Sequence, residues 1–442
     1  MTRRETVFES YNRQKNMCDE RVKNGIEQNR KAYANLSFTD KEGRPLKNVK
    51  FNAALKKHDF KFGCNIFMLD EFETEEKNAK YREMFADVFN YAIVPFYWNG
   101  LEPERGKPRY EKTSPRVYRR PAPDLCVEYC KQNGIGMKGH CLVYDSFSPS
   151  WLPRDVAKIW NEYDRHFEEI SSRYKYDIND WDIINETICW DVYSPQTTPV
   201  YKERNFVEKS FELARHYFPG NNLFINEAAG IWELFRYDRS YFYLLLDRLT
   251  RENVSFDSIG LQMHIFCPKD NEMERGEGRY NPIKAFNVLD TFGEFGKPLH
   301  LSEVTIPAYF GDEQGEEIQA ELLCHLYKMW FSHKSCEGIA YWNLVDGYAH
   351  GAPLGDMTSG ENVYAGGLLN FDMSEKAAFK MLKKLVKEEW TTKCEDRTND
   401  FGKACFRGFK GVYDLTYYVD GREYKTEFSV TDDVAQIKIV AE

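Results

Sequence analysis

Eight short apolar segments alternate with longer amphipathic ones through the middle of this chain. Each short segment has the length and residue content of a buried strand; they are Phe60–Asn65, Tyr91–Phe96, Gly136–Val143, Trp181–Glu186, Leu223–Glu227, Ser258–Ile265, Pro298–Ile306 and Gly338–Leu344. The longer segments repeat apolar residues at helical spacing; they are Glu75–Asn90, Ala122–Asn133, Asp155–Tyr174, Tyr201–Tyr217, Phe235–Glu252, Pro282–Phe295, Glu313–Ser335 and Ser374–Glu389. This alternation predicts an α/β fold of parallel strands joined by helices. The number of repeats favours a closed (β/α)₈ TIM barrel over an open doubly wound sheet.

Both ends of the chain differ from the middle. Residues 1–33 predict a charged helix on the surface, and Leu36–Phe51 predicts a hairpin that turns at Asp40–Gly43. Three further strands are expected near the C-terminus, with a strong Asp-Gly hairpin signal between the first two; they are Val412–Val419, Arg422–Val430 and Ala435–Val440. We therefore expect a small β-sandwich-like module built from residues 34–59 and 395–442, beside a barrel of residues 60–394. The module either binds carbohydrate or only fixes the termini, and we favour the second interpretation.

Composition narrows the possible partners. The net charge of −10 argues against nucleic acid, because phosphate binding needs a basic surface. It also argues against an anionic membrane surface, and no apolar run is long enough to cross a bilayer. The first residues contain no apolar leader segment, and the odd number of cysteines, eleven, suggests reduced thiols rather than a disulfide framework. We expect a cytoplasmic protein, or a secreted one if a leader has been removed.

Two glutamates stand at the ends of predicted strands. The fourth strand ends at Asn185-Glu186 and the seventh at Ser302-Glu303, and barrel enzymes place catalytic groups at these carboxyl-terminal ends. Glycoside hydrolysis with retention of configuration uses such a pair: one carboxylic acid protonates the leaving oxygen, and one carboxylate attacks the anomeric carbon. The acid needs a raised pKa. The amide of Asn185 could hydrogen-bond the sugar 2-hydroxyl, although an Asn-Glu pair alone is more often a helix or strand end exposed to water.

A set of short motifs accompanies the two glutamates in a fixed order. The motifs are Glu102-Pro103-x-x-Gly106, Gly139-His140-x-Leu142-Val143, Pro149-x-Trp151, Trp181-Asp182-x-x-Asn185-Glu186, Gly260-x-Gln262-x-His264, Ser302-Glu303, Trp342-x-x-x-Asp346 and Gly367-Leu368-Leu369-x-Phe371-Asp372. Each motif alone is weak, but the ordered set is specific. Over about residues 60–390 the chain resembles glycoside hydrolase family 10 of clan A, whose best-known members are endo-β-1,4-xylanases.

The resemblance implies a role for each matching residue. Glu186 would be the general acid/base and Glu303 the nucleophile. The subsite around the cleaved bond would be formed by His140, Asn185, Gln262, His264 and Trp342. Among these, His264 would orient the nucleophile, Gln262 would lie close to the acid/base, and Trp342 would form the floor under the sugar. The alternative for the two histidines is a hydrogen-bonded core position. No cofactor is implied, and no metal-ligand cluster is evident.

The chain departs from the family pattern where the next sugar on the glycone side would bind. The family's Glu-Asn-x-x-Lys falls on Ile93–Tyr97, and its Trp-His-x-Gln falls on Tyr144-Asp145-Ser146-Phe147. Its second pocket tryptophan falls on His350, and the Asp two residues after the nucleophile is Thr305. We expect a rebuilt glycone subsite whose substrate contacts include Tyr97, Tyr144, Asp145 and His350.

The segment Asp346–Asn362 contains several glycines and predicts a long loop over the pocket. Its polar residues either contact substrate or form a solvated surface; they are Asp346, His350, Asp356 and Glu361.

Three functions fit these observations. The leading hypothesis is a retaining hydrolase that cleaves β-1,4-xylosidic bonds in xylan or xylo-oligosaccharides, so that the partner is a β-linked plant polysaccharide or oligosaccharide. The second is a clan A glycosidase of shifted specificity on another β-linked or decorated glycan, which the rebuilt subsite favours. The third is an inactive carbohydrate-binding protein, against which the retained glutamates argue. A nucleotide-dependent barrel enzyme lacks support, because no phosphate-cradling glycine-rich loop is present.

Overall fold

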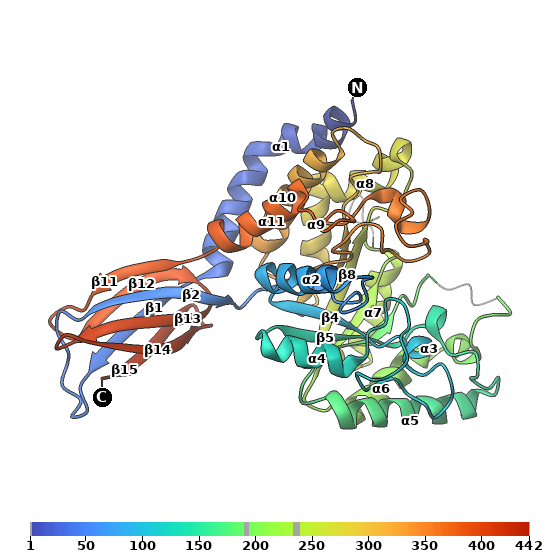
Figure 1. Ribbon diagram of the computed structural model, residues 1–442, viewed down its shortest axis with the longest axis horizontal. Coiled ribbons are helices and arrows are strands. Elements are labelled where there is room, and N and C mark those ends of the chain that lie inside the picture. Colours follow the sequence, from blue (N-terminus) through green and yellow to red (C-terminus); the bar gives the residue numbers. More distant parts are fainter. Residues whose placement is uncertain (1, 190–193, 233–238, 442) are drawn as a thin grey trace.

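The computed structural model describes residues 2–189, 194–232 and 239–441 and contains a closed eight-stranded parallel barrel (Figure 1). Its strands, in order around the barrel, are β3 (Lys61–Asn65), β4 (Tyr91–Pro95), β5 (Gly136–Val143), β6 (Asp180–Asn185), β7 (Asn222–Glu227), β8 (Ser258–His264), β9 (Leu299–Thr305) and β10 (Cys336–Tyr341). Nearly every residue of these strands is buried, because helices cover the outside of a parallel barrel while side chains fill the inside. The predicted TIM barrel is confirmed.

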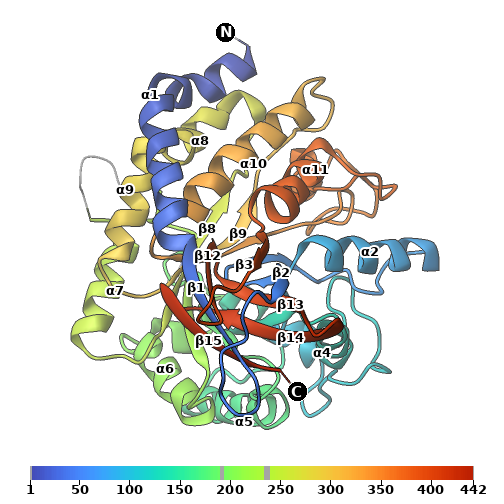
Figure 2. The ribbon, with the colours of Figure 1, turned by 90° about the vertical axis from the view of Figure 1, so that its left-hand side faces the viewer.

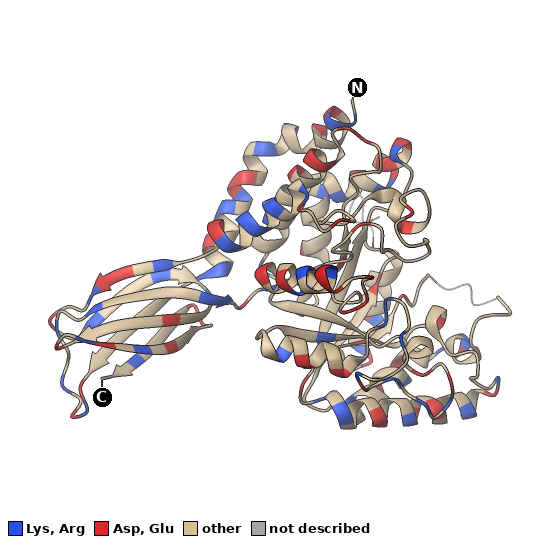
Figure 3. Ribbon diagram, in the orientation of Figure 1, with Lys and Arg blue, Asp and Glu red and all other residues tan. Residues whose placement is uncertain are grey.

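Helices follow the strands and surround the barrel. They are α2 (Glu75–Val88), α3 (Trp98–Leu101), α4 (Pro123–Gln132), α5 (Val156–Tyr174), α6 (Phe206–Tyr217), α7 (Tyr241–Arg251), α8 (Glu272–Tyr280), α9 (Pro282–Gly293), α10 (Gly315–Ser332) and α11 (Ala377–Lys384). Side-chain caps fix several helix starts: Asp155 accepts from the Lys158 amide before α5, and Asn281 precedes a proline at the start of α9. Acidic and basic residues are interspersed along the outer faces (Figure 3). The sequence pattern missed the short helices α3 and α8.

The N-terminal helix α1 (Arg3–Gly25) lies along the outside of the barrel beside α8, α9 and α10 (Figure 2). It is not only a charged surface helix, because one face buries Val7, Phe8 and Cys18. The Arg3 guanidinium also forms an ion pair of 2.7 Å with Glu272 on α8.

Two small sheets form a separate β-sandwich at one side of the barrel (Figure 1). One sheet has the order β12-β1-β15 and the other β11-β2-β13-β14, from β1 (Lys31–Thr39), β2 (Lys50–His58), β11 (Lys393–Arg397), β12 (Lys403–Phe409), β13 (Gly411–Val419), β14 (Arg422–Val430) and β15 (Val434–Val440). Alternate residues of each strand meet in one core, which includes Leu36, Phe38, Phe51, Tyr413 and Leu415. The termini therefore build one module, as predicted.

The predicted hairpin over Leu36–Phe51 forms only close to its turn, where Thr39 pairs antiparallel with Pro45 and the Leu46 amide donates to the Phe38 carbonyl at 3.0 Å. A turn does form, because the Gly43 amide donates to the Asp40 carbonyl at 3.0 Å. The strands on either side of it, however, separate into opposite sheets: β1 pairs with β12 and β15, and β2 pairs with β11 and β13. The physical reason is burial, since Phe38 and Phe51 face each other across the sandwich core with ring centroids 5.6 Å apart.

Arg30 joins the module to the barrel. Its guanidinium donates to the Cys336 carbonyl at 2.5 Å and to the carbonyls of Phe331 and His333, and it lies 4.7 Å from the ring centroid of Phe60. Within the described ranges, no helix is long and apolar enough to span a membrane. All eleven cysteines belong to these ranges, and none is paired with another.

Candidate active site

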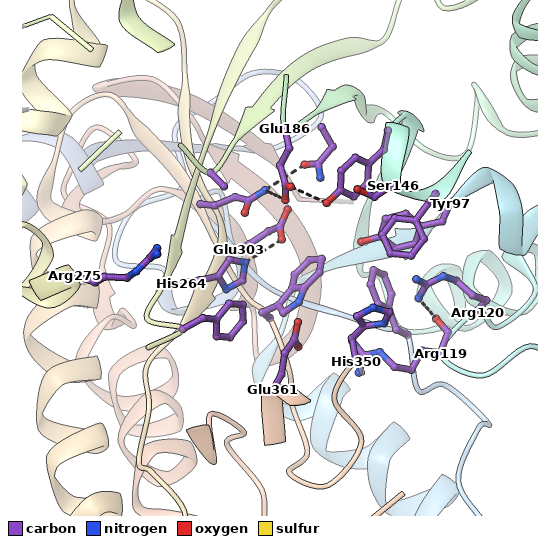
Figure 4. Close-up of a pocket in the computed structure, with 18 of the residues that line it drawn as sticks. Tyr97, Arg119, Arg120, Ser146, Glu186, His264, Arg275, Glu303, His350 and Glu361 are labelled. Atoms are coloured by element: carbon purple, nitrogen blue, oxygen red, sulfur yellow. Dashed lines mark hydrogen bonds and ion pairs between the residues drawn. The ribbon is translucent and has the colours of Figure 1, made fainter. Parts of the chain in front are cut away.

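A cavity of about 410 Å³ opens at the carboxyl-terminal face of the barrel, with Glu186 and Glu303 in its wall (Figure 4). Glu186 follows the last residue of β6, and Glu303 lies near the end of β9. Parallel strands bring their carboxyl ends to one face, so residues far apart in sequence meet there. The structure therefore brings the two predicted catalytic glutamates into one site.

Glu186 is held by two side-chain donors. The Tyr144 hydroxyl donates to Glu186 Oε2 at 2.7 Å, and Gln262 Nε2 donates to Oε1 at 3.1 Å. The backbone of Glu186 adopts a left-handed φ of 57°, which is uncommon for a residue with a Cβ and typical of functional sites. Its amide donates to the Asn226 carbonyl at 2.9 Å. Together these contacts fix the carboxylate relative to the barrel.

Glu303 is buried and hydrogen-bonded at both oxygens. Asn226 Nδ2 donates to Oε1 at 2.8 Å, and His264 Nε2 lies 3.1 Å from Oε2. Burial raises the pKa of the Glu303 carboxyl to about 8; His140 opposes this shift, and the charge of Glu186 adds to it. The two carboxyl groups are therefore close enough to influence each other's charge.

His264 is a neutral imidazole that donates a hydrogen bond to the carboxylate of Glu303. Burial lowers the pKa of His264 to about 4, so one ring nitrogen carries hydrogen and the other accepts. Thr305 Oγ1 lies 2.9 Å from Nδ1. The hydroxyl can donate to Nδ1, which leaves the Nε2 hydrogen for Glu303.

Asn226, near the end of β7, connects the two glutamates and was not predicted. Its Nδ2 also donates to Asn185 Oδ1 at 2.6 Å, and its Oδ1 accepts from Ser302 Oγ at 2.5 Å. Gly260 makes room for this side chain, because a Cβ at Gly260 would lie 2.2 Å from Asn226 Oδ1. The sequence feature that could have predicted Asn226 is a polar side chain one position before the end of a buried strand.

Most of the predicted substrate contacts line the cavity: Tyr97, Tyr144, Asn185, Gln262, His264, Trp342 and His350. Two do not. His140 is buried beneath the wall, where Nδ1 is 2.7 Å from Asp182 Oδ2 and Nε2 is 3.0 Å from the Tyr97 hydroxyl. Asp145 lies outside the lining because its carboxylate accepts from the Thr198 amide at 3.0 Å.

Two of the sequence motifs form a structural unit outside the cavity lining. The Glu102 carboxylate is buried and accepts from Trp98 Nε1 at 2.9 Å; Arg165 Nη2 on α5 lies 2.8 and 2.9 Å from its two oxygens and forms an ion pair with it. Trp151 Nε1 donates to the Glu102 carbonyl at 2.8 Å. The unit fixes the loops after β4 and β5 against α5.

The loop Asp346–Asn362 divides into structural and cavity residues. Asp346 is buried in an ion pair of 2.8 Å with Lys376 and accepts from the Gly367 amide, so it fixes the chain after β10. Asp356 accepts from Thr358 and Ser359 at the surface. Only His350 and Glu361 of the four predicted polar residues line the cavity.

Four arginines in the cavity lining were not predicted. Arg119 and Arg120 lie on one side of the two glutamates and Arg275 on the other (Figure 4); Arg279 completes the set. They come from the loop before α4 and from α8. No group of histidine, cysteine and carboxylate side chains within the described ranges could hold a metal ion.

Comparison with known proteins agrees with this geometry. Residues 50–384 match the family described as glycosyl hydrolase family 10. The chain belongs to glycoside hydrolase family 10. Its barrel superposes on family 10 enzymes of known structure, for example xylanase 10B from Thermotoga petrophila in complex with xylobiose, with a TM-score of 0.59 and 19% identity over 75% of this chain and 95% of that one. This likeness shows the shared fold.

Curated relatives are distant. The anti-sigma-I factor RsgI6 of Acetivibrio thermocellus is 24% identical over 90% of this chain and 46% of its own length. Endo-1,4-beta-xylanase B of Neocallimastix patriciarum is 25% identical over 49% of this chain and 24% of its own length. The chain thus spans less than half the length of either relative.

The chain differs from the family 10 pattern on one side of the cavity. The family's Glu-Asn-Lys set is missing there, and Arg119 and Arg120 line that side.

Proposed function

We propose that this chain is a retaining β-glycoside hydrolase that cleaves β-1,4-xylosidic bonds in xylan or xylo-oligosaccharides. The observation that carries the proposal is the convergence of Glu186 and Glu303 on one cavity, each held by its own donors and linked through Asn226. Membership of family 10 supports it. So do the relatives named as xylanases, although their identity to this chain is low.

Glu303 acts first in this mechanism. Its carboxylate attacks the anomeric carbon and forms an ester bond to the sugar while the glycosidic C–O bond breaks, and Glu186 gives its proton to the leaving oxygen. His264 and Asn226 keep the carboxylate in line. Asn185 Oδ1 accepts from Asn226 and Gln262, so the Asn185 amide nitrogen is oriented toward the sugar.

Glu186 then reverses its role. It removes a proton from water, and the oxygen of that water attacks the anomeric carbon and displaces Glu303 as a free carboxylate. The hydrogen bonds from Tyr144 and Gln262 hold Glu186 in one position through both steps.

The test is hydrolysis of a panel of aryl β-glycosides and plant glycans by the wild type, Glu186→Ala and Glu303→Ala. We expect cleavage of xylosides, with kcat/KM lowered by at least about 10³-fold in Glu303→Ala. Cleavage of another glycan with the same dependence on both glutamates would keep the mechanism and replace the substrate. Activity that survives in Glu303→Ala would remove the proposed nucleophile.

One comparison favours a second function, carbohydrate binding without turnover. The relative named as an anti-sigma-I factor matches 90% of this chain. That relative is named as a factor and not as a hydrolase. Binding of xylo-oligosaccharide by the wild type without any hydrolysis would support this second function.

A further inference from the structure

Arg120 lies in the cavity wall without a carboxylate partner. Its guanidinium donates to the Arg119 carbonyl at 2.8 Å, and among the described residues it forms no ion pair with an acidic side chain. Burial lowers its pKa to about 10, so the group remains a cation at neutral pH. A desolvated charge without a counter-ion is costly to maintain.

Aromatic rings surround this cation. The guanidinium carbon is 4.0 Å from the ring centroid of Tyr97, 5.2 Å from that of Phe147 and 5.5 Å from that of Phe67. All three rings line the cavity. They hold the guanidinium plane in one orientation, and they also offer the apolar surface on which sugar rings stack.

Arg119 adds a second fixed positive charge. It is 4% exposed and donates to the Tyr348 carbonyl at 2.5 Å and to Asn343 Oδ1 at 3.0 Å. Its Nε is buried without a hydrogen-bond partner in the described part of the chain. Its backbone φ of 59° is in the left-handed region, a strain found where a functional position requires it.

These charges gather on one side of the catalytic pair. Figure 4 places Arg119, Arg120 and Tyr97 together, away from Arg275 across the glutamates. This is the side where the family's Glu-Asn-Lys set, which hydrogen-bonds a neutral sugar, is absent. The glutamate of that set is therefore missing from this wall, and Arg119 and Arg120 line it, so the wall is more positively charged than the family pattern.

We propose that the end of the cavity lined by Arg119 and Arg120 binds a carboxylate on the substrate. This carboxylate belongs to the sugar that precedes, on the glycone side, the sugar whose bond is cleaved; that sugar either is a uronic acid or carries one as a branch. The planar guanidinium of Arg120 forms two parallel hydrogen bonds to the carboxylate, while Arg119 adds attraction through its charge. The inference rests on the proposed hydrolysis, and it names the class of glycan that the site selects.

The test compares substrates that differ only in charge. Uronic-acid-substituted xylo-oligosaccharides, oligosaccharides with a uronic acid in the backbone, and the carboxyl-reduced form of each are assayed with the wild type. We expect kcat/KM to be about 10- to 100-fold higher for at least one acidic substrate than for its reduced form. The ratio of kcat/KM for the acidic substrate to kcat/KM for its reduced form is compared between the two kinds of substrate. The larger ratio shows whether the recognised carboxylate is on a branch or in the backbone.

Variants assign the effect to one residue. Arg120→Met keeps the stem on Tyr97 and removes the charge, so the ratio of acidic to reduced substrate should fall toward one. Arg120→Lys keeps the charge without the planar fork and should give an intermediate ratio. Arg275→Met removes an equal charge from the opposite wall and should leave the ratio unchanged. Equal use of both substrates by the wild type, or an unchanged ratio in Arg120→Met, would overturn the inference.

A binding measurement separates this inference from the proposed hydrolysis. Calorimetry with Glu303→Gln and the same oligosaccharides should give at least about tenfold tighter binding of an acidic substrate than of its reduced form, with affinity that weakens as salt increases. If the wild type cleaves nothing and this preference is present, the hydrolysis proposal fails and the carboxylate site stands. Equal affinity for both forms would reject the site whether or not cleavage occurs.

Discussion

Thr305 controls the charge around the nucleophile position at the scale of single residues. The family pattern has an aspartate there, and a carboxylate beside His264 Nδ1 would favour the protonated imidazole. Thr305 offers a neutral hydroxyl at 2.9 Å instead. His264 therefore stays neutral and gives Glu303 a hydrogen bond without a full positive charge. Burial of the Glu303 carboxyl is then the largest influence on its pKa, which rises to about 8.

With an activated aryl glycoside, whose leaving group needs no proton from Glu186, the activity should consequently fall as the pH drops below about 8. Only the ionised carboxylate attacks, so a raised pKa makes the ionised fraction of Glu303 smaller at lower pH. Thr305→Asp should lower this pKa through a positively charged His264 and shift the acid limb of the kcat/KM profile to lower pH. Thr305→Val is the matched control without a new charge. An acid limb at the same pH in the wild type and Thr305→Asp would contradict the electrostatic explanation.

Gly260 should be needed for the position of Asn226. An alanine methyl would meet Asn226 Oδ1 and displace the amide that bonds Asn185 and Glu303. We expect Gly260→Ala to lower kcat by about 10- to 100-fold with a smaller change in KM, because misplaced catalytic groups cost rate. Gly220→Ala is the control, since a Cβ there meets nothing within 4 Å. Equal kcat values in steady-state assays of both variants would refute the role.

Residues at strand ends could be predicted from the sequence, whereas residues positioned by contacts between distant segments could not. Glu186 could be predicted because an apolar run ends there, and Glu303 because it lies near the carboxyl end of another apolar run. Asn226 depends on neighbours from β6, β8 and β9, and Arg120 lies in a loop where no periodicity constrains direction. His140 was placed at the correct strand, but its depth below the cavity depends on the Asp182 partner on β6.

At the scale of elements, helix α5 is tied to the loop after β4 by one buried ion pair. Glu102 is 1% exposed and pairs with Arg165. Arg165→Met would leave the carboxylate buried with weaker compensation, so the free energy of unfolding should fall by about 2–4 kcal/mol. Arg105→Met should cost under about 1 kcal/mol, because that arginine is exposed and pairs with Glu162. Urea unfolding of the two variants would measure the difference; equal midpoints would show that the buried pair has no special role.

The barrel strands were predictable because continuous apolar runs of strand length have few alternatives. The pairing of β1 and β2 was not, because alternation shows which residues face a core but not which sheet a strand joins. The same turn at Asp40–Gly43 permits a hairpin or a crossing between sheets. Burial of Phe38 against Phe51 decided for the crossing.

At the scale of the whole molecule, Arg30 is one of several residues that hold the β-sandwich to the barrel; Lys57 also donates to the Gly134 carbonyl at 2.6 Å, and Phe409 packs on Phe331. Arg30 donates to three backbone carbonyls near the start of β10. Arg30→Met should leave those carbonyls without a partner and increase hydrogen exchange in Phe331–Cys336 and in β1, while the barrel interior stays protected. Arg44→Met, in the exposed Asp40 turn, is the control. Unchanged exchange in Arg30→Met would mean that other contacts carry the attachment.

The central claim is that Glu303 is the nucleophile and Glu186 the acid/base of a retaining glycosidase. The measurement that tests it most directly is the anomeric configuration of the sugar azide formed from an activated aryl β-glycoside when azide rescues each alanine variant. Azide should attack the sugar directly in Glu303→Ala and give the α-azide. In Glu186→Ala it should displace Glu303 from the covalent intermediate and give the β-azide. The opposite assignment of the two products, or the same configuration from both variants, would contradict the account.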